Sequence, residues 1–519
     1  MPHSTRPVGR LAAMVTLLTD QARQSLLAGE RLPRLPIPSH IVSNGEFTPP
    51  AQSAALKRYE RAVLERAQKA AGTDLSRISR WLASPIGMAN AFGALNEVFD
   101  TDFALGEGET EDADEAEAQR AALADQFVFD DQVHFLRDDA DPAMFEPLTG
   151  LIELSAELLG LPHAPSRAGA FDIEQIKFAH FIKAIYLDSD TKVALLSGAP
   201  SEGVPMLSND QMAAARAAVN GVVGERRLLT HAVLSPGQDG WLDEIDRVHE
   251  VLKPDGWKGY TVGEPFSPSF KRYRLDDEAL MYPAYERMAK AGVRNVCIHK
   301  GLLPENADEV MPGAEPFAKV DDVGKAARDW PQLNFVIYHA GYRTIPQPTI
   351  AELERFEATG RIDWVSDLAA IPERYGVQNV YADIGASFAF TVLTHPRLAA
   401  AMIGMLVKGL GADKVLWGTD SVWYGSPQWQ IEALRRLRMP EDLVERFGYQ
   451  PLGEADGPLK RAILGENAAP LYGVDPADYR KSAIKGRHLD RIVETYRSEG
   501  GTPDNAVHGY AHPERPSDA

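Results

Sequence analysis

The chain has 519 residues, 44% hydrophobic and 25% charged, which is ordinary for a globular protein large enough to bury a core without covalent crosslinks. Its net charge of -20 argues against nucleic acid or an anionic membrane surface as a partner, because both require clustered Lys and Arg. The single cysteine, Cys297, excludes an intramolecular disulfide and a cysteine-based zinc site. No apolar run approaches the roughly 20 residues of a transmembrane helix.

Residues 1–125 are expected to form a mostly helical extension, because 51–71 and 75–99 are rich in Ala, Leu, Glu, Lys and Arg. Residues 11–18 have the pattern of a short signal segment, but no small-residue cleavage site closes it. We therefore expect an amphipathic helix and a cytoplasmic protein, with export by an N-terminal signal as the alternative. The acidic run 106–117 is predicted to be a solvated loop at the domain boundary.

Short apolar runs alternate with helical stretches from residue 127 onward, and this alternation predicts parallel strands joined by helical crossovers. Eight such units favour a closed (β/α)₈ TIM barrel over residues 126–474, followed by a helix and a flexible tail over 475–519. An open doubly wound sheet is the alternative, but it predicts a Gly-rich loop after the first strand, which is missing. The runs are 127–129, 193–196, 227–230, 259–262, 295–298, 334–338, 379–382 and 414–417.

Five of these runs are followed by a His or Asp: His134, His299, His339, Asp383 and Asp420. The active site of such a barrel lies at the carboxyl ends of its strands, so these side chains are expected to converge at one rim. Imidazole and carboxylate groups together suit zinc, manganese or iron, and a metal with an open position activates water near neutral pH. The pattern therefore predicts a metal-dependent enzyme with His299, His339 and Asp420 at its centre.

Four motifs, in order and at barrel spacing, resemble the amidohydrolase-related family, which contains hydrolases of amides, esters and lactones and non-oxidative decarboxylases. The resemblance covers about residues 127 to 473. It implies that His299 and Asp420 are metal ligands and that His339 contacts the metal-bound water or serves as the acid/base. The motifs are IHKG at 298–301, NFVIYHAG at 334–341, VLWGTDS at 415–421 and ILGENAAPLYG at 463–473.

One departure from the family pattern concerns the first strand. The family usually has His-x-His or an acidic residue before x-His at this place, whereas this chain has Gln132-Val133-His134. One divalent metal, with Zn²⁺ expected and Mn²⁺ or Fe²⁺ as alternatives, would be held by His134, His299 and Asp420. Gln132 and Asp383 would then be weak ligands or lie behind the ligands. Alternatively, Asp130 or Asp131 takes part.

Several nearby residues receive secondary expectations. Lys258 is predicted to lie at the start of a strand, at the opposite rim, and to be a surface lysine. A surface position for this lysine favours a site with one metal over a site with two. Lys300 and Arg343 closely follow two of the rim His residues and are candidates to hold a substrate carboxylate. Trp423 and Tyr424 flank Asp420 and are candidates for an aromatic wall.

Three functions remain open. The preferred hypothesis is a metal-dependent hydrolase that cleaves an amide, ester or lactone bond of a small aromatic or carboxylated substrate through activated water. The alternatives are a non-oxidative decarboxylase, which would use the same residues, and a barrel that has lost strong metal binding and serves as a binding protein. We also expect a homodimer or higher homo-oligomer, in which the N-terminal extension packs over the barrel or a partner subunit and shapes access to the site.

Overall fold

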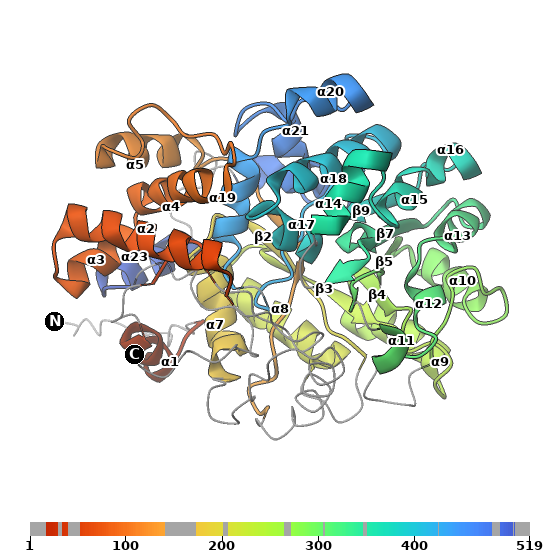
Figure 1. The fold of residues 1–519 in the computed structure, drawn as a ribbon. Helices are drawn as coiled ribbons and strands as arrows, with labels where there is room; N and C mark the ends of the chain where they lie inside the picture. Colours follow the sequence, from red (N-terminus) through yellow and green to blue (C-terminus); the bar gives the residue numbers. More distant parts are fainter. Residues whose placement is uncertain are drawn as a thin grey trace, which may run out of the picture.

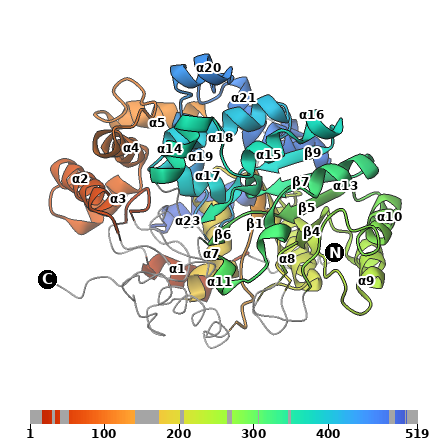
Figure 2. The same ribbon diagram turned by 45° about the vertical axis from the view of Figure 1, so that its right-hand side comes forward.

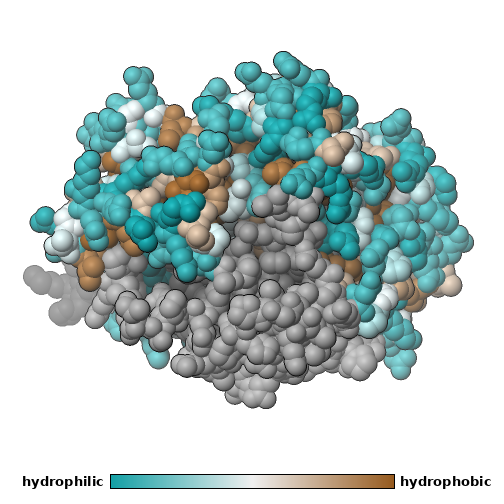
Figure 3. Space-filling model, viewed as in Figure 1, coloured by the Kyte–Doolittle hydropathy of each residue, from teal (hydrophilic) through white to brown (hydrophobic). Residues whose placement is uncertain are grey.

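A computed structural model describes residues 17–29, 34–39, 52–140, 173–200, 206–263, 271–304, 307–345, 350–423, 425–479, 488–501 and 503. The signal-like segment and the predicted flexible tail lie largely outside these residues. No helix in the described part of the chain is long and apolar enough to cross a membrane. On the face seen in Figure 3, the coloured surface is mostly hydrophilic, in keeping with the strongly acidic sequence.

Eight parallel strands form one sheet in the order β1-β2-β3-β4-β5-β7-β9-β10 (Figure 1). The sheet closes on itself, because the amide of Asp131 donates to the carbonyl of Trp417 and Val133 forms a parallel bridge with Ser421. The predicted TIM barrel is thereby confirmed, strand for strand. The strands are β1 Phe129–Val133, β2 Val193–Leu196, β3 Leu228–Val233, β4 Gly256–Tyr260, β5 Asn295–His299, β7 Asn334–Tyr338, β9 Val380–Asp383 and β10 Val415–Leu416.

A second, two-stranded sheet lies beyond the barrel rim and was not predicted. Its strands β6 (Leu303–Pro304) and β8 (Thr344–Ile345) pair in parallel. These strands belong to the segments that follow β5 and β7, the two strands that lead into His299 and His339. The pairing therefore ties together the loops on either side of the predicted site.

Helices between the strands cover the outside of the barrel. The cap of α8 (Asn209–Val223) shows why the sequence starts it there, since Ser208 and Gln211 form a reciprocal capping box and Gly224 ends the helix with a φ of 76°. Other outer helices are α9 Trp241–Arg247, α10 Tyr282–Ala291, α13 Val323–Asp329, α14 Ile350–Thr359, α15 Val365–Ala369, α16 Ile371–Tyr375, α17 Gly385–Val392, α18 Pro396–Gly409, α19 Gln428–Arg436, α20 Glu441–Phe447 and α23 His488–Ser498.

The N-terminal helices gather on one side of the barrel, far from α9 and α10, in both ribbon views (Figures 1 and 2). On α2, a buried face recurs at helical spacing and consists of Leu56, Tyr59, Val63 and Ala67. Helix α2 packs against α3 and α4. The helices of this group are α2 Ala54–Ala71, α3 Leu75–Leu82, α4 Pro85–Phe99 and α5 Ala113–Ala122.

The acidic run 106–117 is mostly exposed, as predicted, but only its first half is a loop. Its second half begins α5, and Glu109 is only 3% exposed. Arg436 of α19 makes an ion pair with Glu109, and the amide of Ala104 donates to the carbonyl of Arg436. The difference arises because the guanidinium of Arg436, far away in the sequence, pairs with Glu109 of the acidic run. This ion pair connects the N-terminal extension to the barrel.

Candidate active site

The five predicted rim residues all lie at or just after the carboxyl ends of their strands, and all are nearly or fully buried. His339 and Asp420 share an unusual backbone conformation, with φ values of 59° and 60°. Non-glycine residues seldom adopt positive φ, and such strain concentrates at functional sites. In each case the chain turns sharply where the strand ends, which directs the side chain back over the barrel.

His134, Asp420 and Gln132 form a compact trio. Nε2 of His134 lies 3.0 Å from Oδ1 of Asp420. Nε2 of Gln132 donates to the same oxygen at 3.1 Å and lies 3.4 Å from Nε2 of His134. All three side chains are buried, and strand β1 together with the turn after β10 positions them.

The tautomer of His134 follows from its second nitrogen. Nδ1 lies 2.8 Å from the carbonyl oxygen of Ser197, which can only accept, so Nδ1 carries the proton. Nε2 of His134 therefore faces Asp420 and Gln132. This is the arrangement that metal-binding histidines usually have, with the outer N–H held by a carbonyl. Trp423 stacks on the same ring, with centroids 5.6 Å apart, and confines it from the side.

His339 has the opposite tautomer. The backbone N–H of Ala386 donates to Nδ1 of His339 at 3.2 Å, so this nitrogen holds the lone pair. Burial, reinforced by the nearby His299 and Lys258, lowers the pKa of His339 well below its usual value, so the ring is neutral. The proton is then on Nε2, which points at Gln132 from 3.5 Å. His339 is thus a hydrogen-bond donor toward the trio, in line with its predicted role beside the metal rather than on it.

His299 lies next to this group but does not join the trio. Its ring centre is 4.8 Å from that of His339 and stacks on Tyr260 at 5.2 Å. Burial lowers the pKa of His299 to about 3, with contributions from the positive charges around it. Among the described residues, no three His, Cys, Asp or Glu side chains are placed to hold a metal ion. The structure therefore does not bring His134, His299 and Asp420 together as a set of ligands among the described residues.

The trio nevertheless fits a divalent cation if Gln132 is counted. Nε2 of His134 and Oδ1 of Asp420, two possible ligand atoms, lie 3.0 Å apart, and the amide group of Gln132 lies beside both. Oε1 of Gln132 is buried and has no hydrogen-bond partner. An amide oxygen can bind hard divalent ions. An amide oxygen that lacks a hydrogen-bond partner and lies beside His134 and Asp420 therefore supports a divalent cation site. His134, Asp420 and Gln132 are the residues that would hold the metal.

Behind the trio lies a pair of carboxylates, Asp131 and Asp383, both fully buried. Burial and the nearby charge of Asp383 raise the pKa of Asp131, and burial raises the pKa of Asp383 to about 6. Oδ1 of Asp383 faces the backbone N–H of His339 at 3.5 Å, which places Asp383 behind the ligands rather than among them. Neighbouring Asp130 accepts from the amide and hydroxyl of Thr419 and anchors the turn before Asp420, so it does not join the trio either.

The prediction that Lys258 is a surface lysine at the opposite rim is wrong. Strand β4 begins at Gly256, three residues earlier than predicted, so Lys258 lies in mid-strand and its side chain points into the barrel. Its Nζ has no hydrogen-bond partner and sits 3.5 Å from the ring centre of Tyr338. Burial lowers the pKa of Lys258 to about 8.

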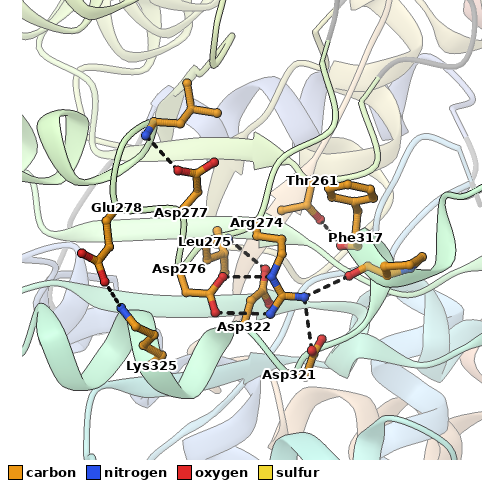
Figure 4. Close-up of polar contacts among 12 residues, drawn as sticks. Thr261, Arg274, Leu275, Asp276, Asp277, Glu278, Phe317, Asp321, Asp322 and Lys325 are labelled. Carbon is orange, nitrogen blue, oxygen red and sulfur yellow. Dashed lines mark hydrogen bonds and ion pairs between the residues drawn. The ribbon is translucent and has the colours of Figure 1, made fainter.

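The expectation that Lys300 faces the substrate is also contradicted. Residues adjacent in a strand point to opposite faces, so Lys300 points outward when His299 points inward. Its Nζ makes a fully buried ion pair with Asp322 at 2.8 Å and donates to the carbonyl of Phe317. Figure 4 shows this region outside the barrel, where Arg274 lies between Asp276 and Asp321 and beside Asp322.

The remaining candidates divide. Arg343 is 36% exposed in its side chain, 4.0 Å from a carboxylate of Glu315 and stacked over Trp364 at 5.7 Å, so it lies outside the buried trio. Tyr424 lies outside the described residues. Sequence reasoning missed Ser197 and Ala386, which fix the two tautomers through backbone atoms and therefore leave no signal in residue type.

Three solved structures illustrate what the chain is similar to. An uncharacterized TIM-barrel protein from Bordetella bronchiseptica is 15% identical with a TM-score of 0.40, over 67% of this chain and 98% of that one. 5-Carboxyvanillate decarboxylase from Novosphingobium aromaticivorans, complexed with manganese, is 16% identical with a TM-score of 0.40, over 68% and 97%. A putative 2-pyrone-4,6-dicarboxylic acid hydrolase from Pseudomonas putida is 15% identical with a TM-score of 0.38, over 67% and 98%. None of these likenesses bears on the reaction of this chain.

Among curated proteins, none has a sequence that matches this chain. The family model described as amidohydrolase matches residues 203–474, which is more than half of the chain and includes His299, His339 and Asp420. The chain belongs to the amidohydrolase family.

Proposed function

We propose that the chain is a metal-dependent hydrolase that cleaves an amide, ester or lactone bond of a small aromatic or carboxylated substrate. The observation that carries this proposal is the grouping of His134, Asp420 and His339 around Gln132. Nε2 of His134, a carboxylate oxygen of Asp420 and the Nε2–H of His339 lie within 3.0 to 3.5 Å of one another or of the Gln132 amide. This combination suits a carbonyl group that must be polarised while water attacks it.

The roles of the residues follow from their protonation. When bound, the divalent cation would lower the pKa of water and polarise the carbonyl. His339 donates its Nε2–H to the carbonyl oxygen, which becomes negative as the tetrahedral intermediate forms. Asp420 takes the proton from the attacking water and passes it to the nitrogen or oxygen that leaves when the acyl bond breaks. Trp423 confines one side of the site by its contact with His134.

The test is a panel of amides, esters and lactones of aromatic and carboxylated acids, assayed with the purified full chain after addition of Zn²⁺ or Mn²⁺. Products are identified by mass spectrometry, and released carbon dioxide is measured in parallel. Cleavage by addition of water that disappears in Asp420→Asn supports the proposal. Carbon dioxide release without hydrolysis would replace it with a decarboxylase, and turnover that is unchanged in Asp420→Asn would overturn the assigned site.

A further inference from the structure

The hydrogen-bond contacts of the Gln132 amide conflict with one another in the described site. One amide N–H of Gln132 donates to Asp420, and the amide nitrogen lies 3.4 Å from Nε2 of His134. The same nitrogen, however, faces the N–H of His339, so two donors meet there. Its Oε1 is meanwhile buried without a hydrogen-bond partner, which is unfavourable.

Turning the amide over reverses each of these contacts. Oε1 would then accept from the N–H of His339, but it would also face the carboxylate oxygen of Asp420. Two acceptor oxygens that face each other across one gap are repulsive unless a cation lies between them. The first orientation therefore suits an empty gap, and the second suits a gap that holds a divalent ion.

Gly385, which has a φ of 32°, lies close against the amide of Gln132. A Cβ on this residue would lie 3.2 Å from Oε1 of Gln132 and 2.6 Å from Oδ1 of Asp383. Such a Cβ would also lie 2.7 Å from Nδ1 of His339. Any side chain at this position would therefore crowd the orphaned oxygen, so glycine lets the amide lie close to Asp383 and His339.

We propose that Gln132 is a reversible occupant of the metal site. Without a cation, its N–H groups satisfy the two ligands and keep the site folded; with a cation, the carboxamide turns over and becomes the third, uncharged ligand. This inference rests on the metal-dependent function proposed above. It implies that the metal-free protein is stable and that the metal is held loosely, because only Asp420 contributes a negative charge.

The test compares four forms of the full chain after chelator treatment: wild type, Gln132→Glu, Gln132→Leu and the matched control Gln430→Leu. Gln430 is likewise fully buried with an orphaned Oε1, but it bonds to the carbonyl of Thr419 outside the trio. Binding of Mn²⁺ is measured by titration calorimetry, and Tm is measured with and without Mn²⁺. The visible absorption of bound Co²⁺ reports on the ligand set independently of activity.

Wild type should have a high metal-free Tm and a small rise with Mn²⁺. Gln132→Glu should have a lower metal-free Tm, because a second carboxylate crowds Asp420, and a larger rise, with binding about tenfold tighter or more. Gln132→Leu should lose Tm and bind Mn²⁺ about tenfold more weakly, whereas Gln430→Leu should bind as wild type does.

Two contrary results have separate meanings. If Gln132→Leu binds Mn²⁺ as tightly as wild type and gives the same Co²⁺ spectrum, while His134→Ala abolishes both, the metal centre stands and Gln132 is not a ligand. If no form binds Mn²⁺ or Co²⁺ saturably, Gln132→Glu included, the metal-dependent function fails together with the inference drawn from it.

Discussion

Lys258 and Lys300 are both fully buried, the first in β4 and the second directly after the neighbouring strand β5, but their surroundings differ. Outside the barrel, Lys300 has Asp322 and a carbonyl as partners. Inside, Lys258 lies over the rings of Tyr338 and Tyr260, and neither its Nζ nor the two carboxylate oxygens of Asp131 have a hydrogen-bond partner among the described residues. Buried ionisable groups are thus hydrogen-bonded where they support the fold and lack such partners beneath the site. We expect activity to depend on the inner group and stability on the outer one.

The largest effect should come from the trio of His134, Asp420 and Gln132. Asp420→Asn removes the carboxylate of the trio and its capacity to carry a proton, so kcat/KM should fall by about 10²–10⁴-fold. The free energy of unfolding, measured in urea, should change little, because Asn keeps the volume of Asp. A variant that loses stability and activity in equal measure would show that Asp420 belongs with the structural charges instead.

His339→Ala should lower kcat by about 10²–10³-fold, the usual effect of removing one donor to an oxyanion. The comparison with Asp420→Asn is informative in pH profiles. Because His339 is neutral at all pH values near 7, its removal should leave the shape of the profile of kcat unchanged while lowering its height. A titration that vanishes with His339 would instead assign it an acid/base role.

Asp322→Ala should destabilise the fold by about 3–5 kcal/mol, since it leaves the ammonium of Lys300 buried without a counter-ion. Urea unfolding at constant pH measures this effect. The double variant Asp322→Ala with Lys300→Met serves as the control and should recover much of the loss, because the orphaned charge is gone. If the single and double variants are equally unstable, packing rather than the ion pair holds this region.

Lys258→Met should raise the free energy of unfolding at neutral pH, the opposite of what Asp322→Ala does. The pKa of Lys258 is about 8 in the fold and 10.5 as its ordinary value, so the charged lysine opposes folding fully below pH 8. As pH rises from 8 to 10.5, the folded form is already neutral and the advantage of Met should shrink. Urea unfolding at pH 7 and pH 10 measures both values, and a gain that grows with pH would contradict the assignment.

The smallest effect is expected at the surface. Asp102 pairs with Arg438 at 2.9 Å, but the two side chains are 77% and 54% exposed. Asp102→Asn should change the free energy of unfolding by no more than about 1 kcal/mol, and less at high salt. A loss comparable to that of Asp322→Ala would show that the junction with the N-terminal helices, rather than burial, determines the strength of these pairs.

The sequence predicted the eight strands, their closure and the rim positions of His134, His299, His339, Asp383 and Asp420. Alternating apolar runs and crossovers permit few topologies, and parallel strands bring their carboxyl ends to one edge. The outward direction of Lys300 was also contained in the sequence, because it follows inward-facing His299 in a strand of period two. It was missed because proximity along the chain was taken for proximity in space.

Other features were decided only by the tertiary structure. Lys258 is interior because β4 begins at Gly256, and the start of a strand depends on its pairing with neighbours rather than on its own residues. The tautomers of His134 and His339 are fixed by a carbonyl of Ser197 and an amide of Ala386, and backbone groups are the same in every residue. The sequence alone determined which groups reach the rim. Only the packed barrel decided which nitrogen of His339 carries the proton and brought Gln132 beside His134 and Asp420.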